Sequence, residues 1–149
     1  KATGFVTETG QLLNLMNGVS CLGGRTQISR VLAHAVKETR AKPVKAVVFI
    51  GDCCEEPVDE LCHTAGELGM LRTPVFMFHE GNDAHARAVF QQVSKLSGGA
   101  YAPFDRNSPQ VLKDLMAAVA VYASGGAKAL QDFSSRSSPE VKRLTRQIR

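Results

Sequence analysis

Residues 44–50, VKAVVFI, carry the strongest strand signal in the chain, and Gly51 and Asp52 follow them directly. A short continuous run of β-branched and aromatic residues predicts a strand buried on both faces, because a half-exposed strand would alternate apolar and polar residues. PVFMF at 74–78 and AYAPF at 100–104 predict two more strands of the same kind. Strands of this type are typical of parallel sheets.

The segments between these strands have the apolar spacing of helices. Apolar side chains recur every three or four residues, so that each segment carries one apolar stripe, in residues 28–36, 58–68, 86–96 and 111–119. We expect Asn82 to cap the third of these helices, and Ser108 and Pro109 to begin the fourth. The alternation predicts a doubly wound, Rossmann-like α/β fold with a mainly parallel sheet and helices on both faces.

The fold is expected to occupy residues 1–124, followed by a linker and a basic C-terminal helix in residues 125–149. Ser, Gly and Lys are frequent around residues 124–138, which is typical of a linker. Beyond it, Val141, Leu144 and Ile148 fall on one side of a short helix. We expect this helix to be peripheral, so that its removal would leave most of the stability intact.

The placement of charge does not indicate nucleic-acid binding. Residues 1–135 contain thirteen basic and thirteen acidic side chains, so the net charge of +4 lies entirely in residues 136–149. A nucleic-acid-binding protein usually carries a basic stripe across its fold. No apolar run approaches the ~20 residues that cross a bilayer. We therefore expect neither nucleic acid nor membrane as a partner.

Four cysteines stand at positions 21, 53, 54 and 62. Neither the adjacent pair nor the irregular spacing is typical of a disulfide framework in a secreted protein. The cysteines indicate a reducing compartment, most simply the cytoplasm.

Two positions place oxygen atoms at the expected carboxyl edge of the sheet, where ligands of open α/β sheets bind. Asp52 directly follows the strand at 44–50, and its alternative role is to cap the next helix. Thr26 comes after Gly23, Gly24 and Arg25 and precedes a helix, and its alternative role is to cap that helix. A hydroxyl and a carboxylate at one edge suit a hard cation such as Mg²⁺.

Four segments in order resemble the later part of a von Willebrand factor A-type domain, especially its bacterial members. They are GGRTQI at 23–28, KAVVFIGD at 45–52, TPVFMFHEGND at 73–83 and LSGGAYAPFD at 96–105, within a resemblance that covers about residues 20–122. It implies a metal-ion-dependent adhesion site in which Thr26 and Asp52 are ligands of Mg²⁺. The ion would bridge to an acidic residue of a protein partner, and we expect Arg25 and Glu55 to be contacts at the rim.

The Asp-x-Ser-x-Ser motif of that family does not occur in this chain. By comparison with the family, the chain begins after the first strand, the first helix and the second strand. We therefore expect an N-terminally incomplete fold and a partial metal site. The strand at 44–50 would lack a neighbour on one side, so we expect self-association or completion by the missing N-terminal segment.

Three other interpretations use the same strand end or the residues near it. Cys53 or Cys54 could be a nucleophile with His79 as its partner, although neighbouring carboxylates would raise the thiol pKa. A zinc site from three cysteines and His63 lacks the usual paired C-x₂₋₄-C spacing. A nucleotide hydrolase would use a GxxxxGK[ST] phosphate loop, which this chain does not contain. The sequence favours a protein-binding module over an enzyme.

Overall fold

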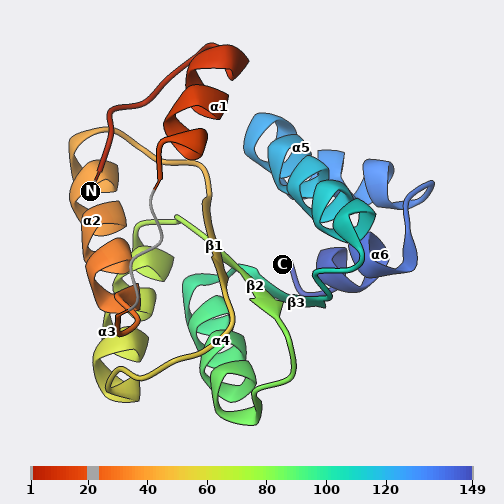
Figure 1. Ribbon diagram of the computed structural model, residues 1–149. Helices are drawn as coiled ribbons and strands as arrows, with labels where there is room; N and C mark the ends of the chain where they lie inside the picture. The colour runs from red at the N-terminus through yellow and green to blue at the C-terminus, as the bar shows by residue number, and fades with distance from the viewer. Residues whose placement is uncertain (1, 20–23, 149) are drawn as a thin grey trace.

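The computed structural model describes residues 2–19 and 24–148, so that Cys21 and Gly23 lie outside the described residues. The elements are α1 (Thr9–Asn17), α2 (Ile28–Ala41), β1 (Val47–Gly51), α3 (Val58–Met70), β2 (Val75–Glu80), α4 (Ala84–Ser97), β3 (Ala100–Phe104), α5 (Pro109–Ser134) and α6 (Pro139–Thr145) (Figure 1). The described strands form one parallel sheet in the order β1-β2-β3. The predicted α/β class and the parallel sheet are confirmed.

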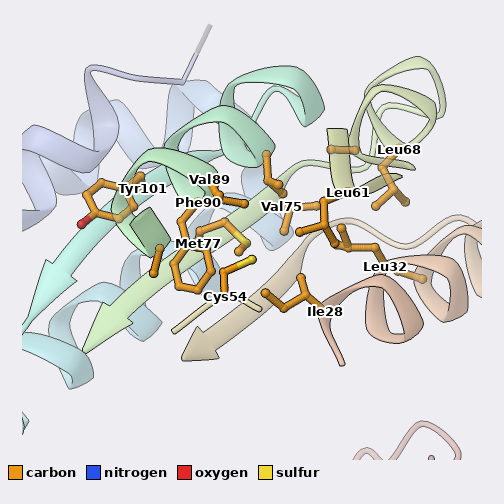
Figure 2. Close-up of a cluster of buried hydrophobic side chains, with 14 of the residues drawn as sticks. Ile28, Leu32, Cys54, Leu61, Leu68, Val75, Met77, Val89, Phe90 and Tyr101 are labelled. Carbon is orange, nitrogen blue, oxygen red and sulfur yellow. The ribbon is translucent and has the colours of Figure 1, made fainter. Parts of the chain in front are cut away.

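Helices cover both faces of this sheet, as predicted. On one face, α2, α3 and α4 pack around Met77 and Tyr101 in the cluster that Figure 2 shows. On the other face, α5 and α6 pack around Phe76 and Phe78. Successive side chains of a strand point to opposite faces, which is why neighbours in β2 belong to different clusters. The central strand is consequently buried from Val75 to His79.

β1 is an edge strand. It pairs with β2 from Val47 opposite Val75 to Gly51 opposite His79, and with no other strand that the structure describes. The Val47 amide donates to the Pro74 carbonyl oxygen at 3.0 Å. By the alternation of a parallel ladder, Val48 and Ile50 direct their backbone groups away from β2. Ile50 is 47% exposed, so the outer edge of β1 is open at its C-terminal half.

The outer edge of β3, in contrast, is closed by a side chain. The amide nitrogen of Gln147, Nε2, donates to the Tyr101 carbonyl oxygen at 2.9 Å. The side-chain oxygen, Oε1, accepts from the Tyr101 amide at 2.9 Å. The Gln147 side chain, which lies just after α6, thus makes the two hydrogen bonds that another strand would make with Tyr101.

The C-terminal region differs from the expected linker and peripheral helix. α5 continues to Ser134 after a break at Gly126, whose φ of 71° suits glycine because it has no Cβ. The expected apolar stripe of α6 is confirmed, but Val141, Leu144 and Ile148 are buried in the same cluster as Phe76. The C-terminal residues therefore belong to the core of the domain. No described helix, not even α5 with 26 residues, has the length and apolar content that would cross a membrane.

Two local features were not predicted. α1 lies at the margin of the molecule in Figure 1, and none of its residues is buried. The N-cap of α4 is Asp83 instead of Asn82, because Oδ1 of Asp83 accepts from the Ala86 amide at 2.6 Å. Asn82 instead belongs to the loop that leaves β2.

Replacing Leu144 tests whether the C-terminal helix is part of the core. We expect Leu144→Ala to lower the free energy of unfolding by about 2–5 kcal/mol, because a fully buried leucine leaves a cavity. For a domain of this size, the melting temperature should fall by about 5–15 °C, as calorimetry would show. Leu96→Ala, at a leucine that is 43% exposed, is the control and should change it little. If Leu144→Ala lowered the melting temperature as little as Leu96→Ala does, the C-terminal helix would not be part of the core.

The open edge of β1 predicts self-association of this chain. Light scattering should show a mass that rises with protein concentration, because the unpaired backbone groups and Ile50 form a template for pairing. Ile50→Lys should return the chain to a monomer without loss of stability, since the side chain is half exposed. Leu96→Lys, at a similarly exposed position on α4, should leave the association unchanged. A wild-type chain that stays monomeric would contradict this prediction.

Candidate functional site

A crevice of 620 Å³ lies at the carboxyl edge of the sheet. Asp52 follows β1, Glu80 ends β2 and Asp105 follows β3, and all three line the crevice. They meet there because parallel strands end at the same edge of a sheet. The other residues that line the crevice are Gly81, Asn82, Pro103, Phe104, Arg106 and Asn107. Asp52 thus lies at the strand end that the sequence indicated.

Negative charge dominates this crevice. Its one cation, Arg106, is paired with Glu80, and Nε lies 2.9 Å from Oε1. The Arg106 side chain is 79% exposed, so water screens the pair and it contributes little to stability. The carboxylates of Asp52 and Asp105 form no ion pair within the described part of the chain. The crevice therefore favours a cationic ligand.

Thr26 is joined to Glu55 and does not line the crevice. The Thr26 amide donates to Oε2 of Glu55, and the Glu55 amide donates to Oγ1 of Thr26, both at 3.1 Å. This reciprocal pair ties the loop before α2 to the loop after β1. Of the four predicted site residues, Thr26 and Glu55 are therefore in contact and Asp52 lies at the crevice. Arg25 is exposed and forms no ion pair among the described residues.

Glu56 occupies the N-terminus of α2. Its carboxylate accepts hydrogen bonds from the Ile28 amide and, at 2.8 Å, from the Ser29 amide. The first amides of a helix lack partners within the helix and carry the positive end of its dipole, so a carboxylate is favoured there. Burial raises the pKa of Glu56, but the hydrogen bonds from Ser29 and Ile28 outweigh it and lower the pKa below its ordinary value of 4.5.

Sequence reasoning missed this role of Glu56. The available signal was indirect: Gln27 precedes α2 and its side chain does not cap the helix, so the helix needs an acceptor from another segment. The second of two adjacent glutamates after β1 provides that acceptor.

His79 is fully buried and connects the three strands. The sequence placed it after the second strand, whereas the structure places it within β2 and not among the residues that line the crevice. Its Nε2 lies 3.3 Å from the Asp52 carbonyl oxygen, and its Nδ1 lies 3.0 Å from the Tyr101 hydroxyl. The ring also packs edge-to-face on Phe90, with 5.4 Å between ring centroids. Sequence analysis identified the histidine but not these contacts.

Gly51, opposite His79 in the sheet, leaves room for the aromatic rings on this face. A Cβ atom at Gly51 would lie 2.7 Å from Cε1 of Phe49 and 3.6 Å from Cζ of Phe90. Contact at the first distance is repulsive, so a side chain here would displace the Phe49 ring. The glycine therefore belongs to the packing that supports the Asp52 loop.

The cysteines beside Asp52 lack the surroundings of a nucleophile. Burial raises the pKa of the Cys53 thiol, and a hydrogen bond to Asp52 and its negative charge raise it further. Cys54 is buried next to Met77 in Figure 2, and both ring nitrogens of His79 are engaged elsewhere. Within residues 2–19 and 24–148, no three His, Cys, Asp or Glu side chains form a group that could hold a metal ion. The zinc interpretation therefore has no geometric support.

The pKa of Glu56 predicts how stability depends on pH. Because the pKa is lowered on folding, the stabilisation by Glu56 is complete above pH 4.5 and is lost as the pH falls through the lower, folded value. We expect Glu56→Gln to lower the melting temperature by about 2–4 °C at pH 7, equivalent to about 1 kcal/mol. The difference from wild type should shrink as the pH falls below 4.5 and through the lower, folded pKa of Glu56.

Glu8→Gln is the control for this experiment, because Glu8 is exposed and its side chain makes no capping hydrogen bond. Its melting temperature should follow that of the wild type at each pH. A difference between Glu56→Gln and wild type that is independent of pH would exclude the ionised carboxylate as the cause.

Comparison of the chain with models of protein families, with curated proteins and with solved structures gave no match. Its function must therefore be inferred from the residues themselves.

Proposed function

We propose that this chain is a protein-binding or assembly module whose binding surface is the crevice edge around Asp52. One observation carries the proposal: an exposed carboxylate stands where the three parallel strands end, and no cation among the described residues neutralises it. A charged group in that place adds nothing to the core but is available to a cation. The resemblance to von Willebrand factor A-type domains supports this role and the assignment of the fold to that type.

Mg²⁺ is the cation that suits this edge. It prefers oxygen ligands, and it usually keeps several waters and takes only one or two carboxylates. Asp52 supplies one carboxylate. Thr26 does not line the crevice and is assigned as a second ligand by the resemblance alone, with one lone pair of its hydroxyl left besides the one that accepts from Glu55. The described residues contain no group of three acidic or metal-binding side chains, so the site fits the ion only in part. When bound, the ion would supply the positive charge that joins Asp52 to an acidic side chain of the partner.

The other residues of this edge hold the loops in place. The Thr26–Glu55 pair and the Glu56 carboxylate at α2 fasten the segment after β1 to the start of α2. Glu55 is exposed although it takes part in these contacts, Arg25 is exposed next to Thr26, and we assign both to the rim that meets the partner. This arrangement supplies binding and orientation, and we assign no catalytic step to it.

The proposal also includes a compartment, a class of partner and a mode of association for the chain. The cysteine spacing supports a reducing compartment, the cytoplasm. The neutral charge of residues 1–135 supports a protein partner over nucleic acid. The open edge of β1 supports self-association or completion by a further strand.

Titration with magnesium chloride tests the metal. With a single protein carboxylate as ligand, we expect a Kd in the millimolar range, on the order of −4 kcal/mol, which amide chemical shifts in NMR can measure. Asp52→Asn should abolish the shifts at the crevice and leave the fold intact, because the side chain is exposed. Asp132→Asn changes an exposed carboxylate of α5 and should leave the titration unchanged.

Capture of a protein partner from cell extract tests the binding role. The partner should be retained in Mg²⁺ and lost in EDTA, and it should be lost with Asp52→Asn but not with Asp132→Asn. A partner that is retained equally in EDTA, or Mg²⁺-induced shifts that are unaffected by Asp52→Asn, would place the binding site elsewhere.

A further inference from the structure

The loop that carries Asp52 rests on a buried chain of hydrogen bonds. His79 is 0% exposed, and its ring lies between the Tyr101 hydroxyl of β3 and the Asp52 carbonyl oxygen at the end of β1. Tyr101 is diagonal to His79 across the β2–β3 ladder, because its direct partner is Met77. The three groups therefore come from three adjacent strands on one face of the sheet.

These contacts define the tautomer of His79. A carbonyl oxygen only accepts, so the ring nitrogen beside it, Nε2, carries the hydrogen. The Tyr101 hydroxyl then donates to Nδ1, so that both ring nitrogens of the buried His79 have a partner. Burial raises the pKa of Tyr101, and the neighbouring Arg87 only partly offsets this effect, so the phenol keeps the proton that it donates.

We propose that His79 is a positioning residue for Asp52, and that its Nε2–H, oriented by Tyr101, holds the Asp52–Cys53 peptide so that the Asp52 carboxylate faces the crevice. The position of that peptide is also set by the end of β1, by the burial of Cys54 in the core and by the contacts of Glu55 and Glu56 further along the loop. A hydrogen bond to the carbonyl fixes the rotation of the peptide plane, and with it the direction of the adjoining Cα–Cβ bond. The role toward a cation rests on the proposed function, whereas the tautomer and the held peptide do not.

Ring nitrogen shifts in NMR test the tautomer without any metal. We expect Nε2 of His79 to be protonated and Nδ1 to be unprotonated at neutral pH. Tyr101→Phe keeps the size of the side chain and removes the hydroxyl, so the Nδ1 shift should move while the Asp52 carbonyl keeps the hydrogen on Nε2. A wild-type ring that carries its hydrogen on Nδ1 would overturn the proposal.

Two amide substitutions of His79 test the held peptide. The nitrogen of glutamine can reach the place of Nε2, whereas the nitrogen of asparagine reaches only the place of Nδ1. We expect the Asp52 carbonyl ¹³C and Cys53 amide ¹⁵N shifts to stay near wild type in His79→Gln and to move in His79→Asn. Because both variants lose the ring that packs on Phe90, their loss of stability is similar and does not produce this contrast. Equal shifts in the two variants would mean that the hydrogen bond does not hold the peptide.

Titration of the same variants with magnesium chloride tests the consequence for Asp52. We expect His79→Asn to weaken Mg²⁺ binding by about tenfold, as the loss of a bond that orients a ligand typically does. His79→Gln should stay within about twofold of wild type, on the same principle. Equal Mg²⁺ affinities in both variants, together with different peptide shifts, would overturn the positioning of Asp52.

Tyr101→Phe provides a second variant that retains the histidine, in case neither amide variant folds. Its Asp52 and Cys53 shifts should move in the direction of those of the Asn variant. Shifts identical to wild type would overturn the role of Tyr101. A wild-type chain that shows no Mg²⁺-dependent shifts would instead overturn the proposed function, and the ring and peptide shifts would still decide whether His79 holds the peptide.

Discussion

The burial of β2 on both faces is the constraint on which the rest of the structure depends. A strand enclosed in this way needs a helical layer on each side and a paired strand on each edge, because unpaired backbone groups away from water are costly. The layers α2–α3–α4 and α5–α6 meet the first requirement, and β1 and β3 meet the second. His79, the polar side chain of the buried run, must also be satisfied, and it is satisfied by groups from both neighbouring strands.

The position of Asp52 is consequently fixed from two directions. Behind the loop, His79 contacts the carbonyl of Asp52 itself. In front, Glu56 places its carboxylate on the first amides of α2, and Thr26 and Glu55 bond to each other. The carboxylate of Glu56 occupies the N-terminus of α2, where an external anion could otherwise bind. Glu56 itself is not among the residues that line the crevice around Asp52. The unpaired first amides of α2 therefore help to position the loop after β1, because that loop supplies the carboxylate that accepts from them.

Much of the fold could be predicted from the sequence, because apolar spacing depends only on which face of an element is buried. The three strands and the central helices were predicted on that basis, and so was Asp52 at a strand end. The extension of α5 past Gly126 was missed because its Ser, Gly and Lys residues give no periodic apolar signal. α1 was missed as well, and none of its residues is buried, so that no face of it is selected by the core. The burial of Leu144 and the contacts of Thr26 depend on segments distant in sequence. The sequence shows which residues can form hydrogen bonds, but their partners are determined by the folded structure.

Closure of the β3 edge by Gln147 also limits the symmetry with which copies of the chain can pair. In a filament built by continuing the sheet, the β1 edge of one copy would pair with the β3 edge of the next, so both edges must be free. If two copies paired through their sheets, the occupied β3 edge would leave β1 to meet another β1, antiparallel and about a two-fold axis. Such an arrangement is complete after two copies and yields a sheet of twice the width. One glutamine side chain thus occupies one of the two sheet edges that a filament would need.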